Sequence, residues 1–234
     1  MAIQELAQSL HGVEQAGPAT PDQAHAVGGE IIVSFRLAQI NDAGAIYIAL
    51  GQALQWDLEV DAVEGARDEN VDIRALRCRI EHCSILHDDQ IRRMQSLEMV
   101  PSFLINHVHY WGHVMRDEVF GPEKVQLLDR CQSVEQAGLN WVMHTDAPVS
   151  PLGTLHKIRV AAARDLWKEP GTILAPDERV SVEAAIRSVT RNAAWACHSE
   201  SEIGSLEPCK LADLVILELD PRKVYPTAIS DIAC

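Results

Sequence analysis

The sequence predicts an α/β fold built around a parallel sheet. Three short strand-like runs, at 75–82, 100–105 and 140–145, alternate with longer segments that show helical patterns. This alternation is typical of βαβ units, which place their strands parallel in one sheet. In α/β barrels the active site lies in the loops after the carboxyl ends of such strands. His82 closes the first run and Asp146 closes the third, so both occupy positions where such sites are built.

Residues 1–68 form a diverged N-terminal segment, for which the sequence gives little basis to assign a structure. Apolar residues at helical spacing near the start are followed by a loop rich in glycine, proline and alanine, which extends to about residue 30. The run 31–35 resembles a buried strand, and 43–67 is predicted to be helical apart from the destabilising Gly51.

The segments between the strands have recognisable helix boundaries. An acidic first turn, which suits the positive end of the helix dipole, predicts a helix that begins near residue 87. A histidine-rich loop is expected at 106–113, after the second strand. The next helix is predicted to run from Pro122 to about Ala137, where Gly138 ends it.

The C-terminal part continues the alternation only briefly. Helices are expected at about 153–167 and 181–194, and the apolar run 212–219 predicts a last short strand. No internal repeat is visible. The chain is therefore divided into the segment 1–68, a region of regular alternation at 69–200 and an appended segment at 201–234.

Composition and charge restrict the function. An apolar fraction of 47% and a charged fraction of 23% are ordinary for a globular protein, so global disorder is not expected. A formal net charge of -14 disfavours nucleic acid and an anionic membrane as partners, whereas a small neutral or cationic molecule fits. The cysteines form no C-x-x-C pair and the N-terminus has no basic or long apolar leader. A cytoplasmic protein with reduced thiols is expected.

His82 and Asp146 can each be interpreted in two ways. A hydrolytic metal site needs neutral imidazole nitrogens and a carboxylate on rigid elements, with one coordination position open for water. Alternatively, His82 is a core histidine satisfied by Glu81 or a backbone carbonyl, and Asp146 accepts backbone N–H bonds in a turn before Pro148. Their position at strand ends favours the metal site.

A stretch rich in histidine and aromatic residues follows the second strand. It contains His107, His109 and Trp111, a mixture typical of a ligand pocket; the alternative is a surface loop with incidental histidines. An H-x-H pair on an extended segment could bind metal, but a loop does not direct the rings to one side, so these residues are predicted to contact substrate. Cys83, next to His82, points to the opposite strand face and is predicted to be packed rather than nucleophilic.

The motifs RIEHC at 79–83 and HTDAPV at 144–149, together with the stretch 103–112, resemble the amidohydrolase superfamily. The resemblance is closest to amidohydrolase family 3, and within it to N-substituted formamide deformylases. It continues through 158–164, 181–194 and the motif GSLEPCKLADLV at 204–215, and so covers about the last two-thirds of the chain.

The resemblance implies a (β/α)8 barrel, a β-sandwich built from both chain ends, and a divalent metal, usually zinc, whose bound water attacks a carbonyl carbon. By this comparison His82 is the metal ligand from strand six. Asp146, at the end of strand eight, contacts the metal and acts as the general base. His107 lies in the strand-seven loop and faces substrate. The implied reaction is hydrolysis of a non-peptide C–N bond in a small amide or N-substituted formamide.

The chain departs from the family pattern in its first part. No H-x-H pair precedes His107, Ile48 stands where a strand-five histidine is expected, and no lysine precedes Lys124; Cys209 also replaces a turn glycine. A complete barrel needs about 250 residues, so the chain is expected to be the C-terminal part of such a hydrolase, with an apparently incomplete barrel. The alternative is a truncated, non-catalytic remnant acting at most as an assembly or binding module. Open barrel edges predict self-association.

Overall fold

The computed structural model describes residues 60–68 and 72–234. The chain divides into two units, residues 1–34 and 35–234, and every described residue belongs to the second. The expected strand at 31–35 and most of the expected helix at 43–67 therefore lie outside the described residues, although 60–68 are helical. The proposed boundaries at 68 and 200 stay predictions.

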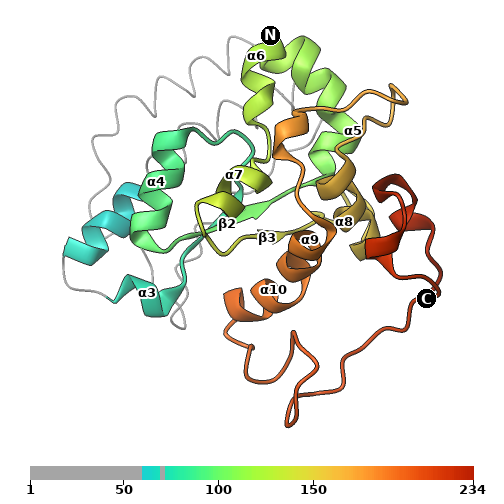
Figure 1. Cartoon of the computed structure of the whole chain (residues 1–234). Helices are drawn as coiled ribbons and strands as arrows, with labels where there is room; N and C mark the ends of the chain where they lie inside the picture. The colour runs from blue at the N-terminus through green and yellow to red at the C-terminus, as the bar shows by residue number, and fades with distance from the viewer. Residues whose placement is uncertain (1–59, 69–71) are drawn as a thin grey trace. The chain divides into compact units, whose positions relative to one another are not determined.

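A three-stranded parallel sheet forms the centre of this unit (Figure 1). Its strands are β1 (Arg79–His82), β2 (Val100–Phe103) and β3 (Val142–Met143), in the order β1-β2-β3. Arg79 pairs with Val100 and Ser102 pairs with Val142, so the carboxyl ends of all three strands meet at one edge. The predicted α/β class with parallel strands is confirmed.

The first strand is shorter than predicted because its beginning folds as a helix. α3 (Ile73–Leu76) starts where the Asp72 side chain accepts a hydrogen bond from the Ala75 N–H, and it ends at Arg77, which has a left-handed backbone. The predicted strand 75–82 was therefore wrong over its first four residues, since the local cap determined the structure there.

α4 (Asp88–Leu97) begins where the sequence predicts it. The Gln90 side chain accepts a hydrogen bond from the His87 N–H at 2.7 Å, and this satisfies a backbone donor that helix geometry leaves free. Ile91, Met94 and Leu97 are buried at the helical spacing. The helix ends at Glu98, in the left-handed region.

The expected histidine-rich loop is instead a helix, α5 (Asn106–Val114), continued by the π-helix Met115–Val119. The loop prediction was wrong because histidines were counted as polar, whereas His107 and His109 are both buried. On a helix, residues two apart point in different directions, so these two rings face different neighbours.

The single helix expected at about 122–137 is broken. The structure forms α6 (Gly121–Lys124), a 3-10 helix (Val125–Leu127) and α7 (Cys131–Gln136). The break occurs at Leu128, which bridges Ile85, and at Asp129, which has a left-handed φ of 45°. A helix cannot continue through such a residue.

Three further helices follow β3 in the sequence. They are α8 (Thr154–Ala163), α9 (Val182–Val189) and α10 (Arg191–Ala196), with a 3-10 helix (Pro176–Glu178) between α8 and α9. Thr190 separates α9 from α10, both of which contact β3 (Figure 1). The predicted helices 153–167 and 181–194 are thus confirmed in type, and each is shorter or divided.

The predicted strand at 212–219 was wrong. Residues 211–217 have no regular secondary structure, and the chain runs as a long loop after α10 (Figure 1). A strand needs a neighbouring strand for its backbone hydrogen bonds, and within the described residues this run makes one such bond, from the Glu218 N–H to the Ala233 carbonyl, and no β-ladder. The chain then forms the 3-10 helices Pro221–Lys223 and Pro226–Asp231, and the second of these packs on α8.

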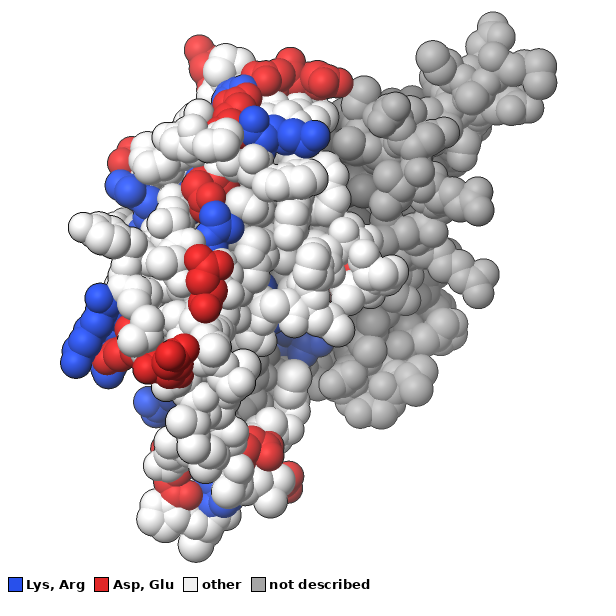
Figure 2. Space-filling model, turned by 90° about the vertical axis from the view of Figure 1, so that its right-hand side faces the viewer, with Lys and Arg blue, Asp and Glu red and all other residues white. Residues whose placement is uncertain are grey.

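The main core includes Phe103 and the fully buried Trp141, whereas Val100 and Val142 pack with Ala196 in a separate, smaller cluster. Figure 2 shows acidic and basic side chains interspersed on one face, so the net negative charge is not gathered into a single patch there. None of the described helices is long and apolar enough to cross a membrane.

Candidate active site

His82 and Asp146 meet at the carboxyl edge of the sheet. They are 64 residues apart in the sequence, yet His82 Nε2 lies 3.9 Å from Asp146 Oδ2. β1 ends at His82 and β3 stops three residues before Asp146, with β2 between the two strands. Their side chains are 20% and 31% exposed, so both are shielded but reachable from solvent.

The backbone at these positions is unusual. His82, Cys83 and Asp146 have φ values of 68°, 47° and 50°, in the left-handed region that residues with a Cβ rarely adopt. Each such residue costs about 1–2 kcal/mol relative to ordinary helical geometry. Strained backbone of this kind clusters at functional sites, where it aims a side chain that regular structure would direct elsewhere.

His144 lies beside His82 and Asp146, and these three side chains form the group at the strand ends. Its ring centroid lies 5.0 Å from that of His82, and its Nε2 is 3.9 Å from Glu81 Oε2. Burial lowers the pKa of His144, with a further contribution from His82, so the ring is neutral near neutral pH. His144 was not among the predicted site residues, although its place two residues before Asp146, on the same face of the predicted strand, was the available signal.

His107 approaches the same group from the first turn of α5. Its ring centroid is 6.2 Å from that of His82. Burial, followed by the charges of His82 and His144, lowers the pKa of His107 to about 3, so this imidazole is also neutral. Its Nδ1 has no hydrogen-bond partner within the described region.

The group has some of the properties that a metal site requires. Metal ligands must be deprotonated, and buried imidazole nitrogens of His82, His107 and His144 are without hydrogen-bond partners among the described residues. However, residues 60–68 and 72–234 contain no cluster of three or more histidine, cysteine or acidic side chains arranged to hold a metal. The donors present thus fit part of a metal site.

The loop that carries Asp146 is tied to α5 by buried polar side chains. Asn106 Nδ2 donates to Ser150 Oγ at 2.8 Å, and Ser150 Oγ donates to the Thr145 carbonyl at 2.6 Å. Ser150 and Asn106 are buried, so neither bond competes freely with water. These contacts position the segment on both sides of Asp146.

His109 does not join this group. Its Nδ1 donates to the Asp165 carbonyl at 2.8 Å, and its ring centroid lies 5.1 Å from that of His156 on α8. The side chain is 7% exposed. Its predicted contact with substrate is therefore not supported by this position, and the buried ring connects α5 to α8 instead.

Trp111 lines a separate cavity of about 200 Å³ next to the group. Its ring lies 5.5 Å from that of His107, nearly perpendicular to it. Cys83 is buried in the core, as predicted.

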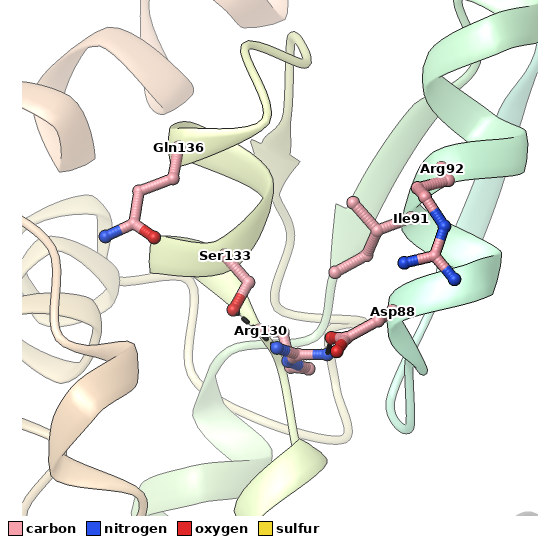
Figure 3. A pocket seen from close by; sticks show the side chains of 6 residues that line it. All are labelled: Asp88, Ile91, Arg92, Arg130, Ser133 and Gln136. Carbon is pink, nitrogen blue, oxygen red and sulfur yellow. Dashed lines mark hydrogen bonds and ion pairs between the residues drawn. The ribbon is translucent and has the colours of Figure 1, made fainter.

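A second cavity, of about 250 Å³, lies between α4 and α7 (Figure 3). Arg130, its central cation, already binds Asp88, Glu178 and Ser133. Since the guanidinium is satisfied by the protein itself, this cavity offers less chemistry than the group at the strand ends.

The chain is similar in sequence to a known protein family and to two relatives from other organisms. A family model described as "Amidohydrolase family" matches residues 42–234. N-substituted formamide deformylase of Arthrobacter pascens is 30% identical over 165 residues, and the match covers 70% of this chain. Protein LONG AFTER FAR-RED 3 of Arabidopsis thaliana is 31% identical over 174 residues, or 74% of this chain. The chain spans only 30% of the length of each of these relatives.

Solved structures are similar as well. An uncharacterised metal-dependent hydrolase of Pyrococcus horikoshii matches 73% of this chain and 33% of its own, with a TM-score of 0.60 and 24% identity. An uncharacterised metal-dependent hydrolase of Pyrococcus furiosus matches 72% of this chain and 32% of its own, with a TM-score of 0.57 and 27% identity. The folds therefore correspond over about a third of each larger protein.

Proposed function

The chain belongs to the amidohydrolase family, and from this premise we propose that it carries part of the active site of a metal-dependent hydrolase. The proposed reaction is hydrolysis of a non-peptide C–N bond in a small amide or N-substituted formamide. The approach of His82 Nε2 to Asp146 Oδ2 at 3.9 Å carries the proposal, because it joins an imidazole and a carboxylate at the active-site edge of a parallel sheet.

In this proposal the described residues form the C-terminal part of a (β/α)8 barrel. His82 and Asp146 would hold a divalent metal, with zinc the first candidate. When bound, such a metal polarises the carbonyl oxygen and lowers the pKa of water. A working zinc site has three or four protein ligands, and the described residues provide no group of three, so the proposal requires further ligands.

The side chains have separate roles. Asp146 acts as general base: it takes a proton from the attacking water and returns it to the leaving nitrogen. His107 is neutral and buried, and its unpartnered Nδ1 is available to a polar group of the substrate. His144 packs against His82 and fixes its ring.

Metal content tests the proposal directly. The variants His82→Asn and Asp146→Asn keep a residue that tolerates a left-handed backbone, and His198→Asn is the control because His198 is exposed at a φ of 56°. We expect about one zinc per chain in the unaltered protein, less in the two site variants and no change in the control. Zinc content and formate release from simple formamides are measured on the same preparations.

An absence of zinc binding at His82 and Asp146 would favour the alternative, a non-catalytic protein. A chain that binds no zinc, or that keeps its zinc in both site variants, is not a metal hydrolase on its own. It is then a non-catalytic remnant of the fold, which acts at most as an assembly or binding module. Restoration of zinc binding by a separately expressed N-terminal half would instead indicate complementation.

A further inference from the structure

Aromatic side chains line the cavity of about 200 Å³ beside the site. Its lining residues are Tyr110, Trp111, Val149, Pro151 and Trp167. None of them is Asp, Glu, Lys, Arg or His, and three of the five are aromatic. A cavity with this lining favours a flat apolar group over a charged one.

The ring of His107 connects the cavity lining to His82 of the proposed catalytic pair. Trp111 contacts His107 at a centroid distance of 5.5 Å, and His107 lies 6.2 Å from His82. Val149 also comes from the loop that follows Asp146. A ligand bound in this aromatic cavity would therefore contact Trp111, which packs on His107, and Val149, whose N–H donates to the Asp146 carbonyl.

The cavity wall is held in place by the protein. Tyr110 contacts Trp111 and Trp167, each at a centroid distance of 5.7 Å. The backbone N–H of Trp167 donates to the His109 carbonyl at 2.9 Å, while the His109 ring donates to the backbone carbonyl of Asp165. A wall that is ordered before binding avoids part of the entropy loss on association.

We propose that this aromatic cavity binds an aryl or similar flat apolar substituent of the substrate amide. This proposal rests on the proposed function, because it assumes that the chain binds an amide substrate. It narrows the substrate class to amides with such a substituent. The cavity is smaller than the range of about 300–1,000 Å³ that is usual for whole ligands, so it takes the substituent rather than the entire molecule.

Ligand binding to the full chain tests this proposal without turnover. The probes are N-phenylacetamide and acetamide, which share the amide and differ in the ring, and binding is followed by NMR titration. We expect N-phenylacetamide to bind at least about tenfold more tightly, because stacking against aromatic walls adds to the area it buries. Trp167→Ala should remove most of this difference, and Tyr110→Leu should reduce it.

Trp195→Phe is the matched control. Trp195 belongs to α10, its ring lies under the guanidinium of Arg77, and it does not line the cavity. Trp167 is 58% exposed, so its truncation should leave the fold intact. Equal affinity for the two probes, or a preference that survives both Trp167→Ala and Tyr110→Leu, would overturn the proposal. Because the titration needs neither metal nor hydrolysis, a failure of the proposed function would appear separately, in the zinc and formate measurements.

Discussion

Arg164 Nη2 donates a hydrogen bond to the backbone carbonyl of Leu128 at 2.7 Å, across 36 residues of sequence. The same guanidinium donates to the carbonyls of Asp129 and Leu174. Arg164 is completely buried, and burial also raises the pKa of the neighbouring Asp129 well above its usual range. This side chain joins the end of α8 to the break between α6 and α7.

Replacing Arg164 with methionine should destabilise the protein by about 3–5 kcal/mol, because it leaves three buried carbonyls without their hydrogen-bond donor. Urea denaturation measures the change. The control is Arg179→Met, since Arg179 is exposed and donates to one carbonyl, that of Pro176. Similar losses in the two variants would contradict the structural role of Arg164.

Gly204 fits a position where no side chain is tolerated. Its φ is +87°, and an added Cβ would lie 2.5 Å from the Cβ of Ala194. Gly171 has a similar φ of +90° but open space around it. Both alanine variants should lose about 1–2 kcal/mol from backbone strain, and Gly204→Ala should lose a further ~1–3 kcal/mol from overpacking. Equal melting temperatures for the two variants would refute the close contact with α10.

The sequence was sufficient for the parts of the fold that depend on local pattern. The runs 100–105 and 140–145 are apolar and short, so their strands and the polar residues beyond them were predictable. α5 was missed because its histidines are buried, and residue type alone does not show burial. The run 212–219 has a strand pattern but forms no β-ladder with the described residues, and a non-local strand partner cannot be read from local sequence.

Ser150 should be important for stability although it lies outside the proposed chemistry. Ser150→Ala leaves Asn106 Nδ2 and the Thr145 carbonyl without their partner, at a cost of about 1–3 kcal/mol. Ser96→Ala serves as the control because Ser96 is exposed on α4. Chemical denaturation of both variants checks the prediction, and a loss no larger than that of the control would argue against it.

Acid should destabilise the protein between about pH 6.5 and pH 4. Burial, together with His109 and Arg159, lowers the pKa of His156 from 6.5 to about 4. In this window the unfolded state takes up a proton that the folded state does not, so stability falls as the pH falls. His156→Phe removes the titrating group and should give a shallower dependence of melting temperature on pH. An unchanged slope would show that other groups dominate.

We also expect self-association through the exposed run at 211–219. Five apolar side chains there are more than half exposed: Leu211, Leu214, Val215, Ile216 and Leu219. An antiparallel pairing of two copies about Val215 would place Lys210 across from Asp220, so the charges at the ends of the run match.

Sedimentation velocity tests this pairing. Ile216→Lys should shift the protein toward monomer, whereas Leu152→Lys should not, because Leu152 is equally exposed in a different loop. A strictly monomeric unaltered protein would contradict the expectation.

The parallel arrangement of β1, β2 and β3 also sets the order in which the site can assemble during synthesis. His82 emerges from the ribosome well before Asp146, and parallel strands pair only after long intervening segments have been made. The two side chains therefore meet only once β3 has docked. Their proximity is a marker of sheet formation, which a fluorescent or paramagnetic label near residue 82 would report in a growing chain.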